Sequence, residues 1–117
     1  MKKYLAVFLG SAESMDAWKT LDDAIRKEKE NAGMQAWMKW AENNESSIVE
    51  MGSPLGKTKR VTKDGITDIR NDMGAWTIVQ AESQEEAAKL FLNHPHFMIF
   101  PGEATEIMEC LPMPNLG

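Results

Sequence analysis

Apolar positions in the first half of the chain change from an unbroken run to a helical period. The run over residues 4–10 predicts a first strand over residues 3–10. A helix capped by Ser14 is expected next, and it should continue to about residue 29. Its apolar residues recur at helical spacing: Trp18, Leu21 and Ile25. The Asn-Ala-Gly sequence of residues 31–33 interrupts this pattern, and a second helical piece follows that ends at Asn43-Asn44.

The middle of the chain combines short strand patterns with turn residues. A strand over residues 47–51 leads into the Gly-Ser-Pro-Leu-Gly bend of residues 52–56. Strands over residues 57–63 and 66–70 then flank Asp64-Gly65. This dipeptide favours a two-residue type I′ hairpin, because both central residues of that turn take positive φ.

The last third of the chain predicts an inner strand, a helix and a final strand. The inner strand covers residues 75–81, and Ser83 then opens a helix with a capping box. In that motif the Ser83 hydroxyl accepts a hydrogen bond from the Glu86 amide, while the Glu86 carboxylate reaches back. The helix is expected to end before Pro95, and the final strand covers residues 105–111.

This order of elements predicts an α+β fold, with one open sheet and helices packed on one of its faces. A chain of 117 residues has the commonest domain size. No linker, repeat or low-complexity stretch divides the sequence. Residues 1–117 are therefore expected to form a single domain.

Both faces of the predicted sheet are apolar. In the first strand Leu5, Val7 and Leu9 point to one face of the sheet, and Tyr4, Ala6 and Phe8 point to the other. The inner strand likewise sets Trp76 and Ile78 against Val79 and Ala81. Because the predicted helices can cover only one face, the other needs a cover of its own. A second copy of the chain is the preferred explanation, since most oligomers are two-fold homodimers; an apolar ligand cleft in a monomer is the alternative.

Composition limits the kinds of binding partner and the cellular compartment that can be expected for the chain. The net charge of -5 disfavours nucleic acid, whose affinity depends on Lys and Arg neutralising phosphates. The basic residues between Lys57 and Lys63 are interpreted as a solvated strand that deters edge pairing, rather than as an anion-binding patch. The single cysteine, Cys110, fits a reducing compartment. The first apolar run is too short for a secretory signal or a membrane span, so we expect a cytoplasmic protein without a membrane partner.

Several segments occur in a characteristic order: a glycine-led strand continuing into a Ser-x-Glu-Glu-Ala helix (74–88), an Asn-His-Pro-His-Phe turn (93–97) and the strand Thr-Glu-Ile-Met-Glu-Cys (105–110). The first strand and the Gly-x-Pro-Leu bend of residues 52–55 extend the series. In this order and spacing the chain resembles the YCII-related family. The resemblance implies a ferredoxin-like antiparallel sheet of the dimeric α+β barrel superfamily, in which two sheets close face to face around a cavity.

The chemistry proposed for some members of that family does not transfer to this chain. It uses a His–Asp dyad, with the histidine in the first helical region and the aspartate in an Asp-Pro turn. Here residues 15–44 contain no histidine, and His94-Pro95 stands where the Asp-Pro turn would be. The resemblance therefore implies a fold without assigning a reaction.

His94 and His96 are the only histidines of the chain and its candidate catalytic residues, because histidine titrates near neutral pH. Two histidines rarely suffice for a tight transition-metal site, so no metal is expected, and no motif calls for another cofactor. His94 follows a predicted helix and is interpreted as a structural cation at its C-terminal end. His96, beyond Pro95, is expected to be the less exposed and the more relevant to function.

The other candidate site residues are aromatic or polar groups on strands. Met34, Trp37 and Met38 lie at helical core spacing and are assigned to core packing. Trp76 and Gln80 share one strand, and Glu109 lies on the last. Polar groups among apolar neighbours are typical of a small-molecule pocket, although bonds between subunits could satisfy them equally well. The candidate ligand-binding residues are Tyr4, Phe8, Trp76, Gln80, His96 and Glu109.

Three functional hypotheses follow from these observations. The preferred one is a small-molecule-binding homodimer with a cavity between its sheets. The second is a cofactor-free enzyme of the lyase, isomerase or monooxygenase type, with a histidine as general base. The third is a structural or interaction subunit. Fold alone does not choose among them.

Overall fold

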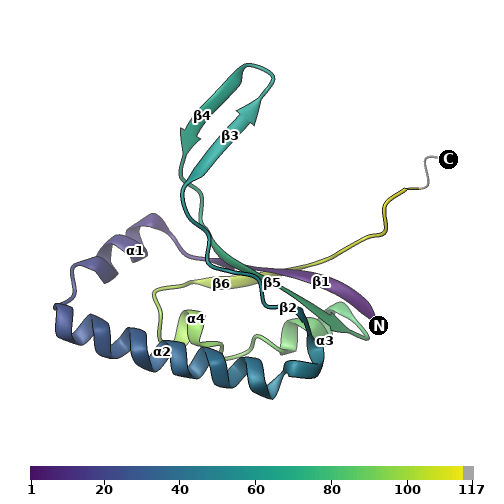
Figure 1. Ribbon diagram of the computed structural model, residues 1–117, viewed down its shortest axis with the longest axis horizontal. Helices are drawn as coiled ribbons and strands as arrows, with labels where there is room; N and C mark the ends of the chain where they lie inside the picture. Colours follow the sequence, from purple (N-terminus) through teal and green to yellow (C-terminus); the bar gives the residue numbers. More distant parts are fainter. Residues whose placement is uncertain (115–117) are drawn as a thin grey trace.

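The unbroken apolar run near the start of the chain forms an inner strand of a four-stranded antiparallel sheet (Figure 1). The computed structural model describes residues 1–114, so residues 115–117 of the predicted domain lie outside the described part. The elements are β1 (Lys2–Leu9), α1 (Ala12–Lys19), α2 (Asp23–Asn43), the short 3-10 helix η1 (Glu45–Ser47), β2 (Ile48–Glu50), β3 (Thr58–Thr62), β4 (Gly65–Ile69), β5 (Met73–Ala81), α3 (Gln84–Lys89), α4 (Pro95–Met98) and β6 (Ala104–Glu109).

The main sheet has the strand order β2-β5-β1-β6, the arrangement of a ferredoxin-like fold. Strand β1 pairs with β5 on one side and with β6 on the other, both antiparallel. Helices α2, α3 and α4 lie on one side of this sheet in Figure 1. The predicted α+β architecture, with helices on one face, is therefore what the chain adopts. None of the helices in residues 1–114 combines the length and hydropathy of a membrane span.

The core lies between the sheet and the helices. Every second residue of β1 faces the helices, and so do the corresponding residues of β5. The buried cluster comprises Tyr4, Ala6, Phe8, Trp40, Val79, Ala81, Ala87 and Phe91. Trp40 also donates its indole N–H to the Leu90 carbonyl at 2.7 Å, which satisfies the polar atom of a buried ring.

The opposite side of the sheet carries the other set of apolar side chains. We call this surface the open face; its residues are Leu5, Val7, Leu9, Trp76, Ile78 and Met108. Val7 is shielded by its neighbours to 8% exposure, while Met108 is 43% exposed. Glu106 pairs with Val7 in register and therefore lies on the same face. The doubly apolar sheet predicted from the strands is thus present, and no described helix covers its open face.

The break between the first two helices lies earlier than predicted. Thr20 to Asp22 separate α1 from α2, and α2 continues through residues 31–33, where an interruption was expected. Ser11, not Ser14, is the N-cap of α1, because its hydroxyl accepts from the Ser14 amide at 3.1 Å. Asp22 caps α2 in the same manner. Local capping groups therefore decide where these helices begin.

The predicted hairpin is formed by β3 and β4, but its turn is not type I′. Thr62 pairs with Gly65, so Lys63 and Asp64 are the connecting residues. Gly65 takes a φ of 128°, whereas Asp64 has negative φ. In Figure 1 the hairpin projects from the sheet on the side away from α2. Its basic residues are exposed, as expected for a solvated strand, and Lys59 pairs with Asp68 across the two strands at 2.6 Å.

Ser83 is the N-cap of α3, and half of the predicted capping box is present. Its hydroxyl accepts from the Glu86 amide at 3.1 Å, while the Glu86 carboxylate pairs instead with Lys89 at 3.4 Å. We expect Ser83→Ala to lower the free energy of unfolding by about 1 kcal/mol, because an amide of the first helical turn loses its acceptor. Thermal melting should fall by a few degrees, with Ser83→Thr as the control that keeps a hydroxyl. An unchanged melting temperature would show that this cap contributes nothing.

Candidate functional site

A large cleft lies between helices α1 and α2 and the segments that lead into and out of the hairpin. Its volume is about 1760 Å³, and residues 51–59 and 68–76 form the side facing the helices. Residues 96 and 100–102 complete the lining. The large apolar or aromatic residues of the lining include Trp18, Met34, Trp37, Met38, Trp76 and Phe100. A cleft of this size can hold a ligand with several fused or linked rings.

Met34 and Met38 belong to this cleft and not to the core, which corrects their assignment from helical spacing. They are 53% and 63% exposed, and both line the cleft. Trp40 faces the core instead, whereas Trp37 is partly buried: its ring packs 4.9 Å from the Phe8 ring and also lines the cleft. Helix α2 therefore has apolar residues on more than the side that covers the sheet. That excess was the available signal for a second apolar surface.

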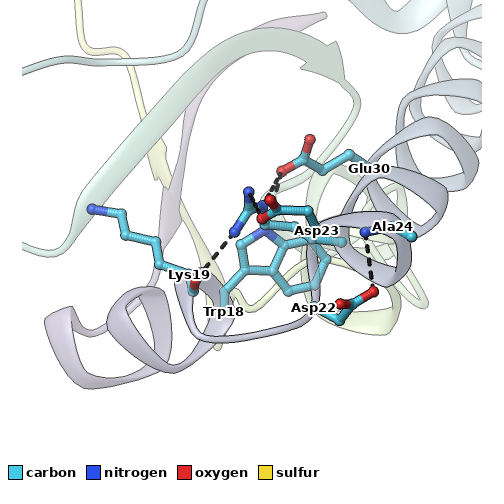
Figure 2. A network of polar contacts seen from close by, with 7 residues as sticks. Trp18, Lys19, Asp22, Asp23, Ala24 and Glu30 are labelled. Carbon is cyan, nitrogen blue, oxygen red and sulfur yellow. Dashed lines mark hydrogen bonds and ion pairs between the residues drawn. The ribbon is translucent and has the colours of Figure 1, made fainter.

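Two polar contacts hold α1 against α2 at one end of the cleft (Figure 2). The Trp18 indole donates to the Glu30 carboxylate at 3.4 Å. Arg26 donates to the Lys19 carbonyl at 3.1 Å and pairs with Asp23 at 2.8 Å. Because Trp18 and Glu30 both line the cleft, these contacts fix the wall that α1 contributes.

Gly33 sets the distance between α2 and the segment that follows α4. A Cβ atom at residue 33 would lie 2.5 Å from the Phe100 ring, so the close approach depends on glycine. Glycine within a helix costs about 1 kcal/mol relative to alanine. Gly33 itself is buried, while Phe100 lines the cleft. Gly33, which does not line the cleft, thus determines the position of the Phe100 ring, which does.

His96 lines the cleft and is held by backbone groups on two sides. Its Nε2 atom lies 2.8 Å from the Leu9 carbonyl oxygen. Its ring packs 5.2 Å from Phe8, and a Cβ at residue 102 would fall within 2.2 Å of the ring, so Gly102 leaves it the space it occupies. Burial lowers the pKa of His96, and backbone carbonyls oppose that shift. The imidazole is therefore neutral near pH 7.

His94 is buried away from solvent, at 0% exposure, so the expectation that His96 is the less exposed histidine is wrong. His94 is not a cation at the end of α3. It is the N-cap of α4, and its Nδ1 atom accepts from the His96 amide at 3.0 Å. Its ring lies among four others, with centroid distances of 4.4 Å to Trp37 and 4.6 Å to Trp40. Burial, and secondarily the neighbouring His96, lower the pKa of His94 to about 3.

The candidate ligand-binding residues fall into two groups. Trp76 and His96 line the cleft. The other four lie elsewhere: Tyr4, Phe8, Gln80 and Glu109. Tyr4 and Phe8 are core residues on the helix side, and Gln80 donates to the Ser46 carbonyl at 3.0 Å. Glu109 pairs with Lys2 at 3.3 Å. Phe8 pairs with Ala75 in register, and Trp76 is the next residue of β5. Because consecutive residues of a strand point to opposite faces, the Phe8 and Trp76 side chains lie on opposite faces of the sheet.

The fold is similar to that of a solved enzyme, whereas sequence comparison gives no family. No protein-family model matches the chain, and no curated protein matches its sequence. The structure is similar to 5-chloro-2-hydroxyhydroquinone dehydrochlorinase (TftG) from Burkholderia phenoliruptrix, solved in complex with 2,5-dihydroxybenzoquinone. The TM-score is 0.54 at 18% identity, over 91% of this chain and 90% of that one. At this identity the likeness establishes the shared α+β fold.

Proposed function

We propose that the chain binds a small, mainly apolar aromatic molecule in the cleft beside α1 and α2. The observation that carries the proposal is the lining itself, in which three tryptophans, a phenylalanine and exposed methionines such as Met34 and Met38 surround a space open to solvent. Exposed apolar side chains gathered around a concavity mark a ligand site, because leaving them in water has a free-energy cost. The structural neighbour supports this choice, since its ligand is a substituted benzoquinone.

We also propose that two copies of the chain associate through their open faces, and that the resulting dimer is cytoplasmic and YCII-like. An apolar sheet face needs a cover, and an identical face supplies one in a two-fold dimer. The hairpin of β3 and β4 projects on this same side, where it would reach beyond the sheet towards a partner. The Glu106 carboxylate would then need a hydrogen-bond donor from the partner, or a position at the solvent-exposed rim of the interface. A cavity between the two sheets forms part of the same proposal.

Replacing Met34 with glutamate tests the ligand site. Met34 is more than half exposed, so the substitution should leave the fold intact while adding a charge to the apolar lining. We expect Met34→Glu to weaken binding of 2-naphthol, a planar aromatic probe, at least tenfold by calorimetry, since the apolar ring would have to lie against a carboxylate. Leu92→Glu is the matched control, because Leu92 is 70% exposed and lies outside the cleft. Equal affinities in the two variants would place the probe elsewhere and refute the site.

A further inference from the structure

The hydrogen bond of His96 determines which of its ring nitrogens carries the proton. Nε2 lies 2.8 Å from the Leu9 carbonyl oxygen, and a carbonyl oxygen can only accept. Nε2 must therefore be the protonated nitrogen. In the neutral ring the second nitrogen, Nδ1, is then an unprotonated acceptor with a free lone pair.

That lone pair receives no hydrogen bond from the part of the protein that the structure describes, since the Ala104 carbonyl that also faces the ring can only accept. Within residues 1–114 no donor bonds His96 Nδ1. The atom also differs from Nε2 of His94, which is sealed from solvent and has no partner in the same part of the chain. The His96 side chain lines the cleft, and its Nδ1 is not among the buried polar atoms without a partner, so a molecule bound in the cleft can reach this acceptor.

The ring is held in place before any ligand arrives. The His96 amide donates to His94 Nδ1 at 3.0 Å, and the Gly102 amide donates to the His96 carbonyl at 2.9 Å. Phe8 supports the ring on one side, and Gly102 leaves room for it on another. An acceptor that is already held in place binds a matching donor more tightly, because the side chain loses little conformational entropy when the ligand binds.

We propose that His96 accepts a hydrogen bond from a hydroxyl group of the ligand, so that the cleft selects hydroxylated aromatic compounds of the phenol class. This inference rests on the proposed function. A carboxylate has no proton to donate and would face the lone pair with like charge. An ammonium could donate, but it would carry a full charge into an apolar cleft. A phenol supplies a neutral donor on a planar apolar body, which matches both the acceptor and the aromatic lining.

A pair of probes that differ only in the donor tests this role. We expect the wild-type protein to bind 2-naphthol roughly tenfold more tightly than 2-methoxynaphthalene, in which a methyl group replaces the phenolic proton. His96→Leu should bind both probes equally, because it removes the acceptor and keeps an apolar side chain. His96→Asn, which can return an oxygen near the position of Nδ1, should regain part of the preference.

The outcomes separate the two proposals. A preference for 2-naphthol that survives in His96→Leu would overturn the role of His96 and leave the cleft proposal standing. Failure of the wild-type protein to bind either probe would overturn both. A second readout avoids dependence on the fold of the variant: in the wild-type protein, the nitrogen-15 resonance of His96 Nδ1 should move on adding 2-naphthol and not on adding 2-methoxynaphthalene. The absence of that difference would also refute the hydrogen bond.

Discussion

The Ile78→Asp substitution is expected to convert the proposed dimer into a folded monomer of 13.1 kDa. Ile78 lies on the open face opposite Leu5, away from the buried cluster on the helix side. In a two-fold interface the substitution buries two carboxylates, one from each copy, and each lacks a designated partner. Such burial costs several kcal/mol, so the dissociation constant should rise at least a thousandfold.

Sedimentation velocity at micromolar concentration measures the effect, and circular dichroism verifies that the fold persists. Leu92→Asp is the control, since it places the same charge on an exposed apolar position away from the sheet. Phe8 and Val79 are unsuitable for this purpose, because both belong to the buried core and a charge there would unfold the chain. A wild-type protein that sediments as a monomer, or an Ile78→Asp variant that remains dimeric, would remove the open face as the interface.

The protein should lose about 2 kcal/mol of stability between pH 7.5 and pH 5.0 because of His94. Its pKa is about 3 in the folded chain against an ordinary value of 6.5, so the unfolded state binds the proton first as the pH falls. Stability from this group is complete above pH 6.5 and declines progressively towards pH 3. The pKa of His96 is lowered as well and adds a contribution of the same sign.

Thermal or urea unfolding across this pH range, in the wild-type protein and in His94→Asn, provides the measurement. Asparagine is a good N-cap and can still accept from the His96 amide, but it does not titrate. The variant should be less stable at pH 7.5, because it loses the ring contacts, and its stability should depend less on pH. The pKa of Glu103 is also lowered, by hydrogen bonds from Ser11 and Ser14, but its ordinary value of 4.5 puts its effect mainly below this range. An equal loss of stability in both proteins would exclude His94 as the origin.

Features encoded by neighbouring residues were predictable from the sequence. The strands followed from their apolar runs, the hairpin from its turn residues, and the start of α3 from Ser83. The His94-Pro95 pair was also a local signal, because proline is favoured at the first position of a helix and would have indicated α4. The charge and burial of His94 depend instead on rings brought from three separate segments of the chain, which no local pattern reveals.

The cleft could be predicted only in part for the same reason. The tryptophans and methionines of α2 were recognised as apolar, but spacing along a helix does not say whether a residue faces the core or a space beside it. Residues 31–33 looked like a helix break because glycine disfavours helices. The contact between Gly33 and Phe100 explains why glycine stands in an unbroken helix, and that contact joins residues 67 positions apart (100 minus 33).

The contact between Gly33 and Phe100 restricts which substitutions related proteins can accumulate at these two positions. The Gly33→Ala substitution would push the aromatic ring aside and alter the cleft, although residue 33 does not line it. Compensation would come most simply from a smaller side chain at residue 100. Among descendants of a common ancestor, residues 33 and 100 should therefore change together, and the size of the molecule each descendant accepts should follow that pair. Ligand range could then evolve through the spacing of the backbone, with the residues that touch the ligand left unchanged.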